Sequence, residues 1–297
     1  MMRYVLAAAA LKTFSLNSGT RKLYRWMGNK VGGRNRVERA DLPNYILRGD
    51  LFVELCRKYG AVKDGDQLFE LGTGWMHWYA LYLRLHFNVR IATLDIWDNR
   101  QFDGLQGTFK RLQAAFAQRG DPPAVMENLR TLLASTSFED LYSRLGLTYT
   151  IEPTGSIAAL PDGSQDCAFS FHVLEHVPAG NVPQLCRDMY RAVKPGGYSI
   201  HQIGIDDHLS HYDRGASHKQ YLSYSDTAWD LLFENEVQYQ NRIQMSEWIK
   251  HFEAPGFKVL DVITEMTDIS KLRIANKYRS YSTDDLKCTI LTLVMKK

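Results

Sequence analysis

The sequence predicts an α/β fold: a Rossmann-like, doubly wound, mostly parallel seven-stranded sheet with an antiparallel C-terminal strand and helical insertions. Three observations predict it. Short buried-strand patterns alternate with helical patterns along the chain. A strand, a glycine turn, a helix and a second strand follow one another between residues 67 and 95, and such a crossover makes the two strands parallel neighbours. Two strand-like runs, 257–262 and 287–295, come last and can pair antiparallel.

The other elements follow from the spacing of apolar residues and from turn residues. Gly60 ends the first helix as a C-cap, and Pro195 with the glycines after it ends a later helix and starts the fifth strand. Residues 98–142 are helical and polar, with a break at 119–123. The remaining predictions are helices over 47–60, 76–87, 182–193 and 229–252, and strands over 147–151, 166–173 and 198–204.

The chain divides into an N-terminal arm, 1–45, and one domain, 46–297, with an insertion at about 98–146 and a lid at about 205–253. The arm mixes apolar residues with Arg21, Lys22, Arg25, Lys30, Arg34 and Arg36. Such a segment either folds over the domain as a solvated arm, which we favour, or makes a peripheral contact with a membrane surface. Its apolar run, 4–11, is too short to span a bilayer.

Composition excludes several classes of protein. Hydrophobic residues make up 45% of the 297 residues, which suits a globular protein with a large core. The net charge of +3 is too small to imply a broad nucleic-acid-binding field, so we do not expect a nucleic-acid partner. Four widely separated cysteines show no paired spacing, which favours buried free thiols in a reducing compartment and therefore a cytoplasmic protein.

The stretch "LFELGTGWMHW", residues 68–78, places glycines where a strand meets a helix. Gly72 and Gly74 flank Thr73, so the backbone turns tightly and lets a ligand approach. Glu70 precedes the turn, and Asp95 ends the next strand, where a carboxylate can accept both hydroxyls of a ribose. A dinucleotide fingerprint needs a third glycine, which is missing here.

Four segments, "FELGTGW", "TLDIWD", "LPDGSQDCAFSFHVLEHV" and "YRAVKPGGY", occur in this order between residues 67 and 204. The series resembles the motifs of class I S-adenosylmethionine-dependent methyltransferases. The resemblance implies S-adenosyl-L-methionine as cofactor, with Gly72 and Gly74 near its methionine part, Glu70 at its ammonium group and Asp95 at its ribose. The cofactor-binding residues that it implies are Glu70, Gly72, Thr73, Gly74, Trp75, Asp95, Ile96, Ser156, Ile157 and His172.

Two of these positions have an interpretation of their own. Members of the family carry an aspartate for the adenine amino group where this chain has Ser156, whose hydroxyl accepts a hydrogen bond without charge. Trp75 begins the predicted helix beside the sulfonium, where cation–π contact is one interpretation and packing is the other.

The acceptor side is predicted from "HQIGIDDHLSHYDR", residues 201–214, which follows the fifth strand. A hydroxyl acceptor needs a base to take its proton. The candidates are His201 first and His208 second, with Asp206 or Asp207 holding the ring. A polar loop with capping aspartates is the structural alternative. His208 and His211, three residues apart, also have a spacing that can hold a metal, but we predict no metal site.

The predicted function is methyl transfer from S-adenosylmethionine to a small-molecule or saccharide acceptor, on a hydroxyl oxygen. A looser resemblance, to methyltransferases of bacterial glycan gene clusters, makes the saccharide the leading acceptor. One alternative is an RNA methyltransferase, although "FHVL" stands after the fourth strand where a base N-methyltransferase has an NPPY-type tetrad. The other is a cofactor-binding protein without catalytic activity.

Overall fold

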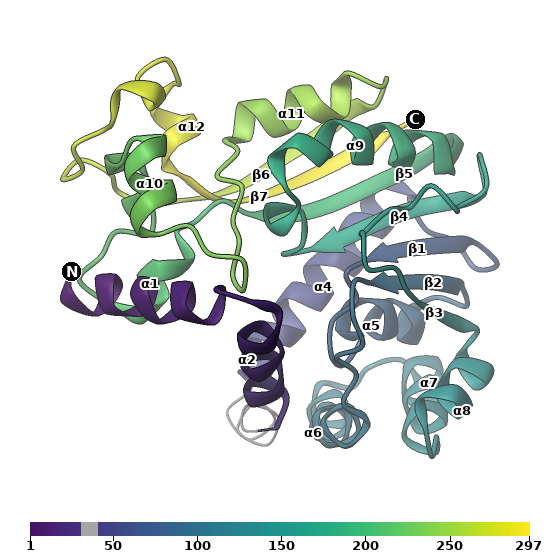
Figure 1. The fold of residues 1–297 in the computed structure, drawn as a ribbon. Helices are drawn as coiled ribbons and strands as arrows, with labels where there is room; N and C mark the ends of the chain where they lie inside the picture. Colours follow the sequence, from purple (N-terminus) through teal and green to yellow (C-terminus); the bar gives the residue numbers. More distant parts are fainter. Residues whose placement is uncertain (31–40) are drawn as a thin grey trace. The chain divides into compact units, whose positions relative to one another are not determined.

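The computed structural model describes residues 1–30 and 41–297 (Figure 1). Two compact units make up the fold. The β1–β4 unit comprises residues 27–170 and 191–199, and the β6–β7 unit comprises residues 1–26, 171–190 and 200–296. Seven strands of the described chain form a sheet in the order β3-β2-β1-β4-β5-β7-β6. The predicted fold class, an α/β fold with a mostly parallel seven-stranded sheet, is confirmed.

The β1–β4 unit contains the glycine turn. Its strands are β1 (Gln67–Leu71), β2 (Arg90–Asp95), β3 (Leu147–Ile151) and β4 (Gln165–Phe171). β1 pairs in parallel with β2 and β4, and β2 pairs in parallel with β3. Asp95 lies opposite Ile151 in the register. Because parallel strands end at the same edge, the loops after β1, β2 and β3 leave the sheet together.

Five helices belong to this unit: α4 (Leu42–Tyr59), α5 (Trp78–His86), α6 (Phe102–Arg119), α7 (Pro123–Leu133) and α8 (Phe138–Leu145). Gly60 ends α4 with φ 62°, as predicted for a C-cap. The insertion consists of α6 to α8, and its predicted break is confirmed because α6 ends at Arg119 and α7 begins at Pro123. Aromatic rings of Trp78, Tyr82 and Phe116 help to join α5 to α6.

The β6–β7 unit carries the antiparallel pair. β6 (Lys258–Met266) pairs with β7 (Cys288–Lys296), which confirms the predicted antiparallel ending. The helices of its 171–190 and 200–296 segments are α9 (Val182–Ala192), α10 (Asp226–Leu232), α11 (Met245–Glu253) and α12 (Thr283–Lys287). The 3₁₀ turns are η1 (Leu174–His176), η2 (Ala179–Asn181), η3 (His208–Tyr212), η4 (Gln220–Ser223) and η5 (Asn276–Tyr278).

Two predicted boundaries are wrong. β5 runs from Val193 to Gly204 and includes the glycines expected to precede it, because the Gly196 N–H and the Gly197 carbonyl bond to Lys297. The helix predicted over 229–252 is two helices, α10 and α11. Arg242 has φ 58°, outside the right-handed helical region, and a capping box formed by Gln244 and Glu247 starts α11 afresh.

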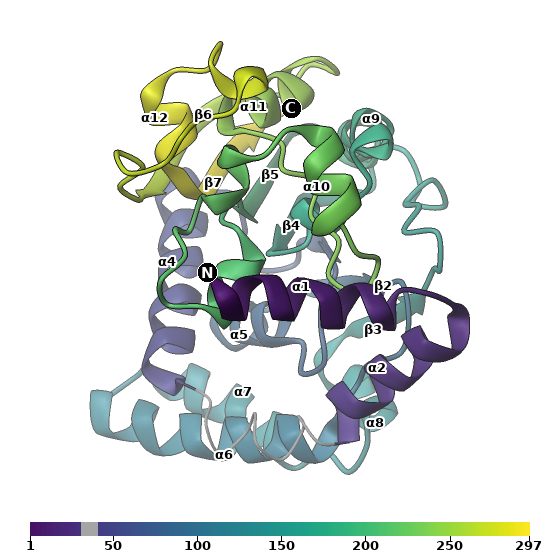
Figure 2. The same ribbon diagram turned by 60° about the vertical axis from the view of Figure 1, so that its left-hand side comes forward.

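The N-terminal helices are α1 (Met2–Phe14) and α2 (Ser18–Lys30). α1 buries Tyr4, Ala8 and Leu11 in an apolar cluster with residues of the predicted lid, among them Trp229. Lys12 Nζ donates hydrogen bonds to two carbonyls of α10, and both ribbon views show α1 beside α10 (Figures 1 and 2). The first part of the predicted arm is thus folded. The predicted arm residues Arg34 and Arg36 lie outside the described residues.

One further expectation concerns the cysteines. Cys56, Cys167, Cys186 and Cys288 are buried and free, as predicted. No helix in the described ranges is long and apolar enough to cross a membrane.

Candidate cofactor and acceptor sites

The glycine turn after β1 has the backbone that only glycine adopts at low cost. Gly72 has φ 72° and Gly74 has φ 71°, both in the left-handed region. The Gly72 N–H donates to the Leu94 carbonyl at 2.7 Å, which fixes the turn against β2. A Cβ placed on Gly74 would meet no atom within 4 Å, so open space lies beside this residue.

The end of β2 lies against this turn. Asp95 Oδ2 accepts a hydrogen bond from the Gly74 N–H at 3.0 Å. Burial raises the pKa of Asp95 to about 7, and the nearby Asp98 carboxylate adds to the rise. Ile96, the next residue, is 49% exposed although it is apolar. The predicted ribose carboxylate and the apolar residue after it thus stand at one edge of the unit.

Glu70 is the most buried charged group of the turn, with 1% of its surface exposed. Its Oε2 has no hydrogen-bond partner among the residues that the structure describes. Burial raises the pKa of Glu70 to about 8, and Asp95 contributes to the rise. A buried carboxylate oxygen without a donor is costly alone and suits a cationic ligand group. The residues present therefore fit the ammonium end of S-adenosylmethionine.

His77 was not predicted as a site residue, yet it braces the turn. It is fully buried and has φ 51°, an uncommon backbone conformation for a side chain of this size. Its Nδ1 donates to the Gly74 carbonyl at 3.1 Å, so its Nε2 accepts from the Tyr142 hydroxyl at 2.7 Å. Burial lowers the pKa of His77 to about 4, which keeps the ring neutral. The insertion thereby holds the glycine turn through α8.

Trp75 does not begin a helix, and that expectation is wrong. α5 begins at Trp78, because the left-handed φ of His77 delays the helix. Trp75 lies in the turn, and its carbonyl accepts a hydrogen bond from the Gln101 N–H at 3.0 Å. Its contact with the cofactor stays a prediction.

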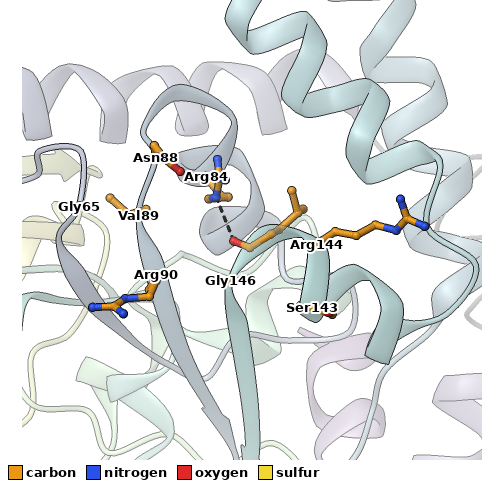
Figure 3. A pocket seen from close by; sticks show the side chains of 9 residues that line it. Gly65, Arg84, Asn88, Val89, Arg90, Ser143, Arg144 and Gly146 are labelled. Carbon is orange, nitrogen blue, oxygen red and sulfur yellow. Dashed lines mark hydrogen bonds between the residues drawn. The ribbon is translucent and has the colours of Figure 1, made fainter.

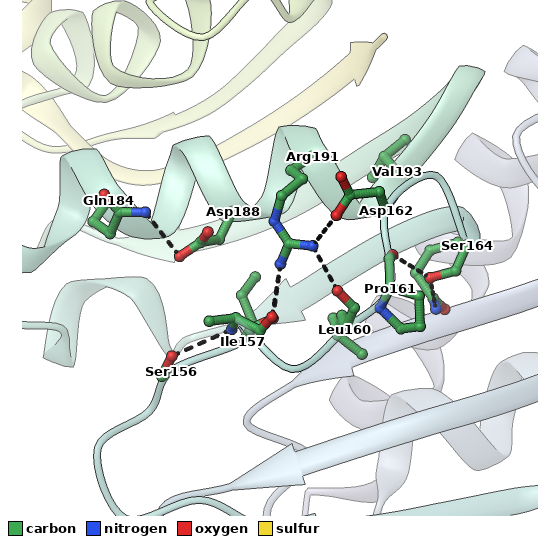
Figure 4. Close-up of polar contacts among 12 residues, drawn as sticks. Ser156, Ile157, Leu160, Pro161, Asp162, Ser164, Gln184, Asp188, Arg191 and Val193 are labelled. Carbon is green, nitrogen blue, oxygen red and sulfur yellow. Dashed lines mark hydrogen bonds and ion pairs between the residues drawn. The ribbon is translucent and has the colours of Figure 1, made fainter.

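The predicted adenine residues lie in the loop after β3. Ser156 is exposed, and its Oγ accepts a hydrogen bond from the Ala158 N–H at 3.2 Å (Figure 4). Ile157 is buried, and its carbonyl accepts from the Arg191 guanidinium. Arg191 also donates to the Leu160 carbonyl at 2.6 Å, so it fixes the shape of this loop. Adenine contact by Ser156 and Ile157 stays a prediction.

A cavity of about 410 Å³ lies at the opposite edge of the same strands (Figure 3). It is lined at the start of β2 by Arg90 and at the end of α8 by Arg144. Arg84, also in the lining, donates to the Leu145 carbonyl at 2.9 Å. The cavity includes none of the predicted cofactor residues, so it is not the predicted site.

The β6–β7 unit gathers polar side chains that the sequence places in three segments. We call them the histidine cluster: His172, Glu175, His176, Asp206, His208, His211 and His218. His211 Nε2 and Asp206 Oδ2 are 2.7 Å apart. This hydrogen bond raises the pKa of His211. Burial alone would raise the pKa of Asp206, but the hydrogen bond from His211 and the charges of the nearby histidines lower it. His172, predicted to bind the cofactor, has its Nδ1 3.4 Å from Glu175 Oε1.

The structure places the predicted bases differently from one another. His201 is fully buried and stacks on Phe252, with ring centroids 5.1 Å apart, and burial lowers its pKa to about 3. His208 belongs to the histidine cluster, and burial followed by the repulsion of His176 lowers its pKa to about 4. Asp207 does not hold a histidine ring. Its carboxylate accepts from the Tyr4 hydroxyl at 2.6 Å and anchors α1.

Sequence reasoning missed Glu175 and His218 as members of this cluster. Glu175 lies inside the quoted segment "FHVLEHV", and a carboxylate between two histidines was the available signal. His218 follows a stretch of loop whose path no periodic pattern predicts. Two polar residues before α11 are used within the fold: Asn241 donates hydrogen bonds to the Leu174 and Val177 carbonyls, and Arg242 pairs with Asp226.

Comparisons with known proteins agree with this architecture. Residues 122–201 match a family model described as a methyltransferase domain. A comparison with curated protein sequences finds no match. Among solved structures, one described as a sarcosine dimethylglycine methyltransferase of Galdieria sulphuraria is similar to this chain. It has 14% identity and a TM-score of 0.50 over 88% of this chain and 89% of that one.

Two other solved structures are also similar. An S-adenosylmethionine-dependent methyltransferase of Mesorhizobium loti has 16% identity and a TM-score of 0.46 over 82% of this chain and 96% of that one. Phosphoethanolamine N-methyltransferase 2 of Haemonchus contortus was solved with S-adenosyl-L-methionine. It has 15% identity and a TM-score of 0.46 over 82% of this chain and 51% of that one. At these identities the likeness concerns the fold and not the acceptor.

The family match begins after β2 and covers α7 to β5, while the glycine turn and Asp95 precede it. The buried, unpaired Glu70 oxygen adds a structural feature that suits the cofactor. The matched domain, which covers residues 122–201 of the 297, indicates a methyltransferase that uses S-adenosyl-L-methionine.

Proposed function

We propose that the enzyme transfers the methyl group to a hydroxyl oxygen of a small-molecule or saccharide acceptor. The contact between Asp206 and His211, 2.7 Å long, carries this proposal. A hydroxyl is a weak nucleophile until a base takes its proton, and a histidine oriented by a carboxylate is a common base. An amine acceptor has less need of such a pair.

In this proposal each residue has a defined task. S-adenosylmethionine supplies a methyl group on a positively charged sulfur. Glu70 would hold its ammonium end, and Asp95 would hold its ribose. Since Nε2 of His211 faces Asp206, Nδ1 is the atom that takes the hydroxyl proton. Asp206 keeps the ring oriented and stabilises the imidazolium that forms. His201 and His208 stay predictions as bases, and their burial ranks them after His211.

A methyl-transfer assay tests this assignment. The acceptors are free sugars, lipid-linked saccharides, simple amines and total RNA. We expect a hydroxyl acceptor to be methylated and His211→Ala to lower turnover by about 10²–10⁴-fold. Asp206→Asn should lower turnover as well, while cofactor affinity stays unchanged in both variants. His251→Ala, which removes a histidine on α11, is the matched control.

Three outcomes contradict the proposal. Methylation of total RNA would favour the RNA methyltransferase. Cofactor binding without transfer to any member of the panel would favour a binding protein without catalytic activity. Full turnover by His211→Ala on the true acceptor would make this pair structural. A saccharide as acceptor is supported by the looser sequence resemblance to glycan methyltransferases, and the sugar arms of the assay test it.

We also propose a peripheral contact between the N-terminal arm and an anionic membrane surface, and a cytoplasmic location. The first 37 residues contain eight Lys and Arg and no Asp or Glu. Several apolar side chains of α1 and α2 are more than 45% exposed: Met2, Val5, Leu6, Leu23 and Trp26. An apolar surface among basic residues suits the interface of an anionic bilayer.

Co-sedimentation with phosphatidylserine-containing vesicles tests the membrane contact. Leu6→Glu and Trp26→Glu should each reduce binding severalfold, because a carboxylate opposes both insertion and the anionic surface. Met266→Glu, at an apolar residue of β6 that is 47% exposed, should bind as the wild type does. Equal sedimentation with neutral and anionic vesicles, or none with either, would refute the contact.

A further inference from the structure

Glu175 is buried without the partners that a carboxylate needs. It is 2% exposed, and neither of its side-chain oxygens accepts a hydrogen bond from any described residue. Among the described residues, His172 comes near this carboxylate, with its Nδ1 3.4 Å from Oε1. A buried carboxylate in this state is costly unless a cation compensates it. The question is which cation the surroundings provide for.

Two histidines stand beside this carboxylate. One ligand atom each of Glu175, His176 and His208 lie within 4.8 Å of one another, and the two rings have centroids 5.0 Å apart. His176 Nδ1 is 2.7 Å from the Tyr239 carbonyl, which can only accept. In the neutral ring Nδ1 therefore carries the proton, and Nε2 offers a lone pair. A histidine held in this way by a backbone carbonyl is the usual arrangement at metal sites.

We propose that Glu175, His176 and His208 bind a divalent transition-metal ion of the zinc class. Two imidazoles and one carboxylate are ligands that Zn²⁺, Co²⁺ and Fe²⁺ accept, and a hard ion such as Mg²⁺ prefers oxygen alone. Ligand atoms around such an ion are about 3.0–3.5 Å apart, since each lies about 2.0–2.2 Å from it. His176 is exposed, so its ring can make the small movement required. This proposal differs from the sequence-based expectation of no metal site, which stays a prediction.

Neighbouring residues support this choice of ligands. A Cβ on Gly204 would stand 2.8 Å from Glu175 Oε1 and 3.1 Å from His172 Nδ1. A glycine at this position therefore leaves room for the Glu175 carboxylate. Asp206, His211 and His218 form a second group of ligand types, but Asp206 and His211 already bond each other.

Calorimetry on the full, chelator-treated chain tests the site, with Zn²⁺ and Co²⁺ as separate probes. We expect one ion per chain, and a Co²⁺ absorption spectrum typical of mixed nitrogen and oxygen ligands. Glu175→Gln and His208→Ala should each weaken binding at least tenfold. His176→Ala should do the same, and because this side chain is exposed, the variant keeps its fold. His251→Ala is the control and should bind as the wild type does.

Metal binding is independent of the acceptor proposed above, because the readout is heat and absorption and not turnover. Absence of binding by the wild type would overturn the site. Binding that survives His176→Ala and Glu175→Gln, but disappears in His211→Ala and His218→Ala, would move the ion to the second group and overturn the ligand set. Unfolding curves without metal show whether each variant is folded.

Discussion

The Gly74 N–H donates a hydrogen bond to the Asp95 carboxylate, with a distance of 3.0 Å between N and Oδ2. This bond joins the glycine turn after β1 to the end of β2. One hydrogen bond therefore connects two residues that are predicted to contact the cofactor. The carboxylate is held in place before any ligand arrives. Its orientation is therefore a property of the fold, and substitutions at either residue should affect cofactor affinity.

Asp95→Ala should weaken binding of S-adenosylhomocysteine by about 1–3 kcal/mol, because a charged hydrogen-bond partner is lost. Asp95→Asn keeps one acceptor oxygen and should lose less. The measurement is calorimetric titration. Asp103→Asn, an exposed carboxylate at the start of α6, is the control. Unchanged affinity in a folded Asp95→Ala variant would place the ribose elsewhere.

Gly74→Ala should weaken cofactor binding at least tenfold, because the added methyl enters the open space beside the turn. The left-handed backbone should also cost about 1–2 kcal/mol of stability. Gly60→Ala is a matched control, since Gly60 has φ 62° and open space around it as well. It should lose similar stability and no affinity. Equal affinity for the two variants would argue against a ligand at Gly74.

Cofactor affinity should rise with pH between about 6 and 8.5. The pKa values of Glu70 and Asp95 lie at about 8 and about 7 without ligand, so both groups hold protons at pH 6. An ammonium group and ribose hydroxyls favour the ionised carboxylates, so binding releases protons and tightens as pH rises. We expect a gain of roughly tenfold or more. Glu70→Gln should flatten the curve, whereas a flat wild-type curve would exclude this coupling.

Tyr142→Phe should destabilise the protein by about 1–3 kcal/mol, because Nε2 of the buried His77 loses the only donor that the described residues give it. Urea unfolding measures this change. Cofactor affinity should also fall, since His77 holds the Gly74 carbonyl. Tyr212→Phe is the control: its hydroxyl contacts Gln238 and its side chain is 44% exposed. Equal unfolding curves for the two variants would show that the His77 contact adds nothing.

Much of the fold could be predicted because local patterns decide it. The strand–glycine–helix series and the closing strand pair are set by period and by turn residues, and both are confirmed. The prediction of one helix over 229–252 is wrong because Arg242 adopts a left-handed φ, which no pattern of apolar residues reveals. Trp75 was placed in a helix for the same reason, since the φ of His77 depends on its bonds to Gly74 and Tyr142.

The candidate site was predicted unevenly. Glu70 lies next to the end of β1 and Asp95 ends β2, and the sequence predicts these strands to be parallel neighbours, so their place follows from topology. The partner of a loop residue depends on how distant segments pack. Asp206 and His211 are close in sequence, so their pairing could have been predicted. Glu175 joins His208 only because two segments far apart in the sequence pack together, and no spacing in the sequence shows this.

Binding of S-adenosylhomocysteine to the pure, chelator-treated full chain tests the central claim most directly. Calorimetry should show one molecule bound per chain, with affinity retained in Gly60→Ala and weakened at least tenfold in Gly74→Ala. The absence of binding at millimolar ligand, with the protein folded by circular dichroism, would contradict the assignment of the glycine turn as a cofactor site.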